Sequence, residues 1–228
     1  MLKKLTDINI AGKTILYRAP YDIGVTEEDG KLTLKDTSRI EATIPTLQYL
    51  IAQKCKIVIL TWVERPDGIE ERYRTTPHAE ALQKMLGVDI QKASDCVGQE
   101  VEQQIANLAP SEILMLENVR FHSEEDANEE KFARELCKGK ELIVFDAFPQ
   151  SHRKAASTTG ILQALPAVAG LYFEKEYTSL KGLLDKPIKP FTVVIGGKKV
   201  ADKAEAVISL AKDADQVLLT GGVANDVL

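Results

Sequence analysis

Four short apolar runs recur along the chain, and each ends in or precedes a polar segment that carries an arginine. The runs lie at residues 14–18, 56–60, 113–116 and 142–145, and their arginines are Arg18, Arg65, Arg120 and Arg153. Runs of this length are too short for buried helices and are typical of strands covered on both faces. The pattern therefore predicts an α/β fold built on a parallel sheet.

Helix signals fill the segments between the runs. Asp36-Thr-Ser38 can cap a helix that begins at Arg39, and Pro45 should kink that helix or delimit its first turn. Further helices are expected at residues 77–86, 97–108, 128–137 and 173–184. A hairpin is expected at Glu28-Asp-Gly30, and residues 166–170 interrupt the alternation.

The C-terminal part of the chain begins a second unit. An apolar run at residues 191–195, a glycine turn, a helix to about residue 212 and a strand at 216–219 follow one another. We expect a three-layer Rossmann-like lobe over residues 1–171, a connecting helix and hinge over 172–189, and the incomplete start of a second α/β lobe over 190–228. Such a short unit cannot bury a core alone, so it could associate with a partner.

Composition and charge narrow the class of protein. The chain has 44% hydrophobic and 28% charged residues, which is ordinary for a globular protein. A net charge of -5 argues against a nucleic-acid partner, and no secretion signal or membrane span is visible. Cys55, Cys96 and Cys137 are widely spaced, so we expect free thiols, no metal site and a cytoplasmic location.

The arginines predict an anion site. In open parallel sheets, ligands bind outside the carboxyl ends of the strands, where these arginines should meet. Arginine suits this role because its planar fork pairs with carboxylate or phosphate through two hydrogen bonds. Arg39, at a helix start, joins the candidates. For any single arginine, a surface salt bridge remains an equally good interpretation.

A glycine turn suggests a second anion site. Gly196 and Gly197 follow a strand, and Lys199 or Lys203 just beyond could supply positive charge to a phosphate. Such turns often have only a structural role, and that interpretation stays open. A second glycine pair, Gly221-Gly222, follows the next strand.

Four other residues are explained without a function of their own. We interpret His78 as a helix surface residue and His122 as a solvated loop residue. Trp62 could pack beneath its loop or line a pocket. Asp146 could cap a turn or hold an arginine.

Together, several motifs resemble phosphoglycerate kinase. They are Leu116-Glu-Asn-Val-Arg-Phe121, Asp146-Ala-Phe148 with His152-Arg153, Leu165-Pro-Ala-Val-Ala-Gly170, Ile195-Gly-Gly-x-Lys-Val-x-Asp-Lys203 and Gly221-Gly222-x-Ala-Asn225. They occur in the family's order. The resemblance implies two α/β lobes, one for 3-phosphoglycerate and one for ADP or ATP with Mg²⁺, that close to transfer a phosphoryl group.

The resemblance also assigns roles to residues. It implies that Arg39, Arg65, Arg120 and Arg153, with Asp22 and Trp62, contact the phosphorylated acid. Gly196, Gly197, Lys199, Lys203, Gly221 and Gly222 match the nucleotide side. Arg39 and Lys203 would act in catalysis, by stabilising the phosphoryl group in transit.

Departures from the family pattern leave a second interpretation open. Pro20 replaces a substrate-contacting aspartate, Asp22 an asparagine, Trp62 a histidine and Glu64 a glycine, while Lys198 replaces an alanine. A carboxylate beside an anion pocket is unfavourable. The alternative is therefore a non-catalytic relative that acts as an anion-binding or protein-interaction module.

Overall fold

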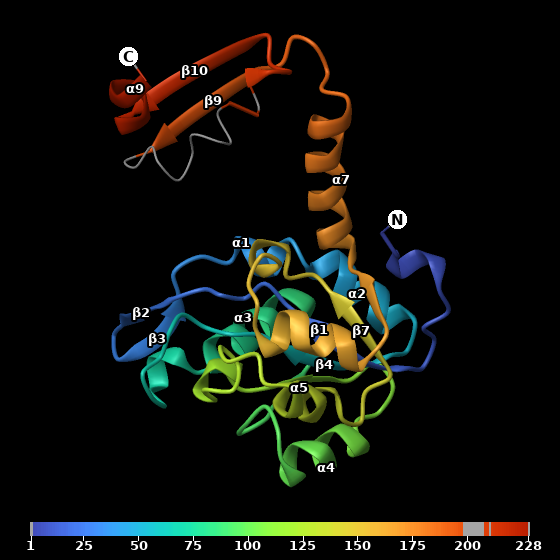
Figure 1. Ribbon diagram of the computed structural model, residues 1–228. Helices are drawn as coiled ribbons and strands as arrows, with labels where there is room; N and C mark the ends of the chain where they lie inside the picture. The colour runs from blue at the N-terminus through green and yellow to red at the C-terminus, as the bar shows by residue number, and fades with distance from the viewer. Residues whose placement is uncertain (1, 198–207, 210, 228) are drawn as a thin grey trace. The chain divides into compact units, whose positions relative to one another are not determined.

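The computed structural model describes residues 2–197, 208–209 and 211–227. The chain divides into two compact units, Met1–Glu176 and Tyr177–Leu228, which are shown in Figure 1. The boundary lies inside the helix that the sequence predicts as a connector. Each unit is described by itself below.

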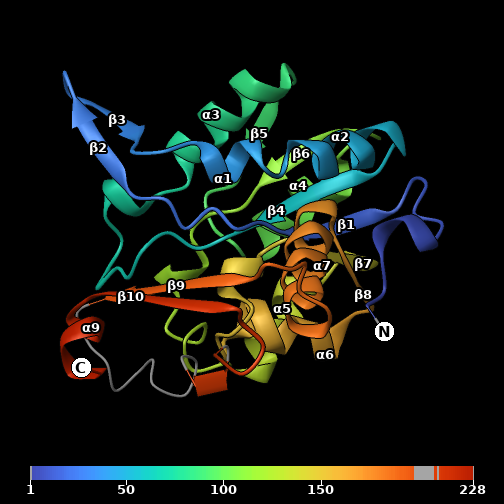
Figure 2. The same cartoon turned by 90° about the horizontal axis from the view of Figure 1, so that it is seen from above.

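The first unit contains a parallel sheet, as predicted, and this sheet has six strands. Its strands follow the order β5-β6-β4-β1-β7-β8, which reads from top to bottom in Figure 2. Their bounds are β1 Thr14–Arg18, β4 Lys56–Leu60, β5 Ile90–Lys92, β6 Ile113–Met115, β7 Leu142–Phe145 and β8 Ala167–Ala169. The strands predicted from apolar runs are confirmed, and they form the four central strands.

Helices cover both faces of this sheet and make three layers. The helices are α1 Ser38–Glu41, α2 Ile44–Ala52, α3 Thr76–Leu86, α4 Gln99–Asn107, α5 Glu130–Cys137 and α6 Ile161–Ala164. On one face, Leu47 of α2 and Leu82 of α3 pack in a core with Tyr17 of β1. On the other face, Ile105 of α4 and Leu136 of α5 pack in a second core with Leu16 of β1. This division follows from the alternation of side chains along a strand.

Short helical turns complete the first unit. They are the 3-10 turns Leu5–Asp7, Glu71–Tyr73, Val119–Phe121 (η3) and Phe148–Gln150 (η4), and the π-helix Ala156–Gly160. Pro45 lies in the first turn of α2 and separates it from α1, so it delimits a helix. None of the helices in the described residues is long and apolar enough to cross a membrane.

Two edge strands were not predicted. β5 (Ile90–Lys92) and β8 (Ala167–Ala169) are as short as β6, but they lack the run of large apolar side chains that predicted β6. Residues 166–170, which were predicted to interrupt the pattern, therefore contain β8. The predicted hairpin is confirmed: β2 Val25–Glu28 pairs with β3 Lys31–Leu34, and Asp29 (φ 51°) and Gly30 (φ 74°) form its turn.

Asp146, just after β7, connects the sheet to the start of helix α7 (Leu171–Asp185). Its carboxylate accepts hydrogen bonds from the Tyr17 hydroxyl and the Phe173 backbone N–H, both at 2.9 Å. Burial raises the pKa of this carboxyl group. A Cβ atom at Gly170 would lie 2.1 Å from an Asp146 carboxylate oxygen. Asp146 therefore caps a helix, and the interpretation that it holds an arginine is wrong.

The second unit contains a two-stranded parallel sheet. β9 (Thr192–Gly197) pairs with β10 (Gln216–Gly221), and α9 (Gly222–Val227) follows. Val194 and Leu218 are 66% and 53% exposed on these strands. Association through this unit stays a prediction.

Candidate anion-binding site

A cavity of about 330 Å³ lies at the carboxyl edge of the first unit's sheet. It is lined by Asp22, Arg39, Trp62, Glu64, Arg65, Arg120, Pro149, Gln150, His152 and Arg153. The structure thus brings together all six residues that the sequence assigned to a phosphorylated acid. Pro149, Gln150 and His152 were not assigned to the site. These three residues follow β7 and lie next to Arg153 in the sequence, and that position could have indicated that they belong to the site.

Five separate segments build this cavity, and the first is the loop after β1 that contains Asp22. Arg39 comes from α1, Trp62 to Arg65 follow β4, and Arg120 lies in the 3-10 turn after β6. Residues 149–153 follow β7 through the turn η4. Because β4, β6 and β7 are parallel strands of one sheet, their carboxyl ends deliver these side chains to the same edge.

Asn118 joins two of the segments. Its Oδ1 accepts hydrogen bonds from the backbone N–H groups of Val63 at 3.0 Å and Arg120 at 3.1 Å. Its Nδ2 donates to the carbonyl oxygens of Val63 at 2.9 Å and Tyr73 at 3.0 Å. All four hydrogen-bonding positions of this buried amide are used. Asn118 therefore fixes the β4 loop against the turn that carries Arg120.

Trp62 lies between two guanidinium groups. The Arg120 guanidinium carbon is 4.1 Å from the centre of the indole, and that of Arg18 is 4.4 Å away. Trp62 is 2% exposed and also lines the cavity, so both interpretations of this residue hold. Stacking on the indole holds the Arg120 side chain in place through cation–π attraction.

Arg18 does not line the cavity. The prediction that this arginine joins the anion site is therefore wrong. Arg18 is the last residue of the central strand β1 and is fully buried. Its Nε donates to the Ser157 carbonyl oxygen at 3.0 Å and to the Ser157 hydroxyl at 3.2 Å. Burial lowers the pKa of Arg18 to about 10, although the nearby Glu125 carboxylate opposes this shift.

Glu125 supports Arg18 through Ser157, which bonds both side chains, and no sequence pattern predicted this role. Its two carboxylate oxygens accept hydrogen bonds from the Ser157 backbone N–H at 2.8 Å and the Ser157 hydroxyl at 2.6 Å. Glu125 is fully buried, and burial raises the pKa of its carboxyl group. Glu125 and Ser157 thus hold the buried guanidinium on which Trp62 rests.

The cavity carries an excess of positive charge. Its four arginines outnumber its two carboxylates, Asp22 and Glu64, which leaves a formal charge of +2. The Arg39 side chain donates to the Asp22 carbonyl oxygen at 2.7 Å, and that of Arg120 to the Glu64 carbonyl oxygen at 2.6 Å. Arg120 Nε also forms an ion pair with Asp126 at 3.4 Å, which leaves Nη2 of each of these two guanidinium groups without a partner among the described residues.

Arg65 and Arg153 are the least constrained of the four. Both are exposed, and neither side chain has a hydrogen bond or ion pair with any residue that the structure describes. In contrast, four buried polar atoms at or behind the cavity have no hydrogen-bond partner among the described residues: Arg18 Nη2, Trp62 Nε1, Arg120 Nε and Gln150 Oε1. Unpaired buried polar groups are unfavourable, so a polar ligand or water would stabilise this region.

Glu64 occupies a backbone conformation that favours glycine. Its φ is 51°, in the left-handed region. Its backbone N–H donates to the Asp22 carboxylate at 2.8 Å. The glycine of the family pattern would fit here without strain, and Glu64 adds a carboxylate at the border of the cavity.

The predicted nucleotide-side residues are only partly described. Gly196 and Gly197 end β9, Gly221 ends β10, and Gly222 begins α9. Gly197 and Gly221 are register partners, and a Cβ atom at Gly221 would lie 3.2 Å from the Gly197 carbonyl oxygen. Lys199 and Lys203 lie outside the described residues.

The interpretation of His78 is wrong, and that of His122 as a solvated loop residue holds only in part. His78 is fully buried, because its helix packs under the loop that contains Ile23, and its Nε2 donates to the Ile23 carbonyl oxygen at 3.0 Å. Burial lowers the pKa of His78 to about 4. His122 is partly buried and pairs with Asp95 at 2.6 Å.

Comparisons with known proteins agree on one family. A family model described as phosphoglycerate kinase matches residues 5–228. Phosphoglycerate kinase of Pelotomaculum thermopropionicum is 42% identical over 227 residues, which are 99% of this chain and 57% of that protein. The chloroplastic phosphoglycerate kinase 1 of Arabidopsis thaliana is 40% identical over 96% of this chain and 45% of its own length.

A solved structure gives the same result. The phosphoglycerate kinase of Pyrococcus horikoshii OT3 superposes with a TM-score of 0.84 at 32% identity, over 99% of this chain and 56% of that chain. This chain therefore spans about half the length of the relatives that it matches.

Proposed function

The chain belongs to the phosphoglycerate kinase family, and we propose that its arginine cavity binds 3-phosphoglycerate or a similar phosphorylated acid. In this proposal the first unit supplies the acid-binding half of phosphoryl transfer between 1,3-bisphosphoglycerate and ADP, a step of glycolysis. The observation that carries the proposal is the convergence of Arg39, Arg65, Arg120 and Arg153 on one cavity with excess positive charge.

The chemistry of phosphoryl transfer supports these residues. Catalysis of this reaction depends mainly on positioning and on neutralising the charge of the transferring group. Arg65 and Arg153 have free guanidinium forks that fit a phosphate, and Arg120 is held in place by Trp62. Arg39 would lie beside the carboxylate and the transferring phosphoryl group.

We assign the nucleotide to the second unit. Gly196, Gly197, Gly221 and Gly222 would let the backbone approach the phosphates of ADP or ATP, and Lys199 and Lys203 would supply charge, with Lys203 acting on the phosphoryl group. Mg²⁺ bound with the nucleotide would neutralise further charge there. The proposed division is 1–171 for the acid, 172–189 for the hinge and 190–228 for the start of the nucleotide lobe.

Location and turnover complete the proposal. Three buried free cysteines support a reducing compartment such as the cytoplasm. We expect the 228-residue chain to bind the acid but to show negligible turnover alone, because it spans about half the length of its relatives.

Calorimetric titration of the chain with 3-phosphoglycerate tests the proposal. Arg65→Ala and Arg153→Ala should each weaken binding by about tenfold or more, because each removes a charge-assisted pair. Neither change should alter stability, since neither side chain has a partner among the described residues. Arg134→Ala, an exposed arginine of α5 outside the cavity, is the matched control. No binding by the folded wild-type chain would overturn the proposal.

A second candidate is a non-catalytic anion-binding module. Glu64 places a carboxylate at the cavity, and Trp62 and Pro20 stand where the family pattern has other residues. The same titration with other phosphorylated acids separates the two candidates. Preference for an acid other than 3-phosphoglycerate would favour the second.

A further inference from the structure

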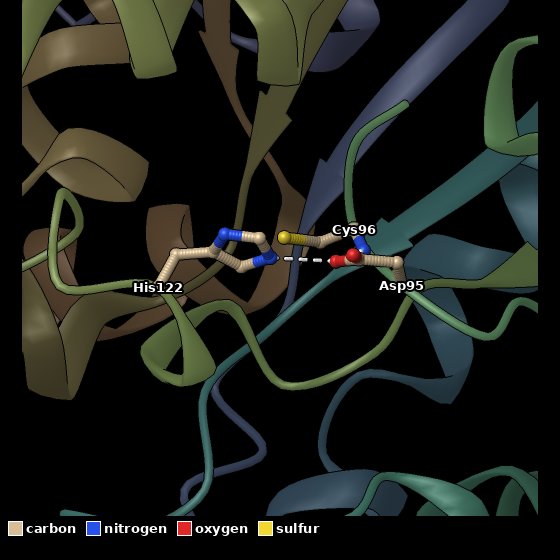
Figure 3. Close-up of side chains that lie close together, drawn as sticks. All are labelled: Asp95, Cys96 and His122. Carbon is tan, nitrogen blue, oxygen red and sulfur yellow. Dashed lines mark hydrogen bonds and ion pairs between the residues drawn. The ribbon is translucent and has the colours of Figure 1, made fainter. Parts of the chain in front are cut away.

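Asp95, Cys96 and His122 form a cluster outside the anion cavity. Each offers one donor atom that can ligate a metal, and these three atoms all lie within 4.8 Å of one another. In Figure 3 the Cys96 sulfur and the Asp95 carboxylate point toward the His122 ring. The cluster contains one sulfur, one nitrogen and one oxygen donor.

The fold brings these residues together from two loops. Asp95 and Cys96 follow β5, and His122 follows β6 through η3. Because β5 and β6 are neighbours in the parallel sheet, their loops leave the same edge side by side. The pairing is therefore a property of the sheet and not of one flexible segment.

Several contacts fix the cluster. The Asp95 carbonyl oxygen accepts a hydrogen bond from the Glu117 backbone N–H at 3.2 Å. The Asp95 carboxylate accepts one from the Cys96 backbone N–H at 2.6 Å. The His122 ring lies 5.1 Å from the Phe132 ring, centre to centre. These contacts orient the Asp95 carboxylate and the His122 ring before any ligand arrives, and Cys96 is confined by the hydrophobic core in which it is buried.

We propose that Asp95, Cys96 and His122 bind a thiophilic divalent cation, with Zn²⁺ as the best match. Zinc is the common protein metal that accepts thiolate, imidazole and carboxylate together, whereas Mg²⁺ prefers oxygen ligands alone. The site is thus distinct in chemistry from the Mg²⁺ that accompanies a nucleotide. Asp95 and Cys96 are adjacent, but His122 lies on another loop of the chain, which is why sequence spacing alone predicts no metal site.

The geometry requires only a small rearrangement. Usual zinc bond lengths in a tetrahedral site separate the donor atoms by roughly 3.2–3.6 Å. The His122 Nε2 and Asp95 Oδ1 atoms are now 2.6 Å apart, so that pair would open by less than about 1 Å. The most distant pair, within 4.8 Å, would close by about 1 Å.

The cluster also has an accessible side. Cys96 is fully buried, whereas the side chains of Asp95 and His122 are 47% and 27% exposed. An ion can enter from the side of these two residues, and a water molecule can complete the four ligands. An ion that binds the Cys96 sulfur would displace the thiol proton.

Metal titration of the full 228-residue chain, first stripped with a chelator, tests the site. We expect one Zn²⁺ per chain in competition with a chromophoric chelator. Co²⁺ in its place should give the absorption bands of a tetrahedral thiolate site. His122→Gln should weaken Zn²⁺ binding by roughly tenfold or more, and Cys96→Ala should remove the cobalt–thiolate band.

Matched controls use the same residue types elsewhere. Cys137→Ala removes another buried thiol and His152→Gln another histidine, and both should bind Zn²⁺ like the wild type. Circular dichroism checks that each variant folds. If Cys96→Ala does not fold, the partly exposed His122→Gln decides the question. The proposal is overturned if Zn²⁺ does not bind at micromolar concentration, or if His122→Gln binds it as tightly as wild type.

Discussion

Asn118 should be the most sensitive position around the anion cavity. Asn118→Ala removes all four hydrogen bonds that its amide makes with Val63, Tyr73 and Arg120. The backbone N–H and carbonyl oxygen of Val63 lie in a residue that is 0% exposed, so both become unpaired away from water. At about 1–3 kcal/mol for each unpaired buried group, the free energy of unfolding should fall by about 2–6 kcal/mol.

Urea denaturation measures this loss directly. Trp62 is the only tryptophan of the chain, so its fluorescence reports on the first unit alone. Asn107→Ala, an exposed asparagine at the end of α4, is the matched control and should change stability by less than about 0.5 kcal/mol. If Asn118→Ala is as stable as this control, the amide does not hold the two loops together and the reasoning fails.

Two further predictions concern charge. Glu64→Gln should tighten 3-phosphoglycerate binding about two- to fivefold by removing an exposed carboxylate. Glu64→Gly should do the same and also raise the free energy of unfolding by about 1 kcal/mol, because glycine tolerates the φ of 51°; equal stability of the two variants would contradict this. His78 has a pKa near 4 when folded and 6.5 when unfolded, so protonation favours the unfolded chain as pH falls between these values. The wild type should lose about 2 kcal/mol of stability from this group between pH 7 and pH 5, a loss absent in His78→Gln; identical pH profiles for the two proteins would refute it.

The central sheet could be predicted because its strands are buried on both faces. Residues 15–17, 57–60 and 142–145 are continuous runs of apolar or aromatic side chains, and this signal does not depend on the rest of the fold. β5 and β8 could not be predicted in the same way. Each has three residues at an edge of the sheet, where exposed or small side chains replace the continuous apolar run.

The anion cavity could be predicted for a related reason, since parallel strands deliver their carboxyl ends to one edge. The sequence did not show that Arg18 is a buried structural residue while the other arginines line the cavity, because this depends on the residue at which each strand ends. Arg18 is still inside β1, while Arg65, Arg120 and Arg153 lie beyond their strands. Contacts between loops, such as Asn118 with Val63 or His122 with Asp95, depend on which strands are neighbours, and that order was not available.

Gly170 and Asp146 carry a constraint on how this chain can evolve. The Asp146 carboxylate occupies the space where any side chain at position 170 would begin, 2.1 Å from the expected Cβ atom. The same carboxylate caps α7 and accepts a hydrogen bond from Tyr17, so replacement of Asp146 would lose both interactions and destabilise the fold. Neither position can drift alone. In a selection for folded variants of this chain, replacements of Gly170 should survive only in genes that have already lost the aspartate.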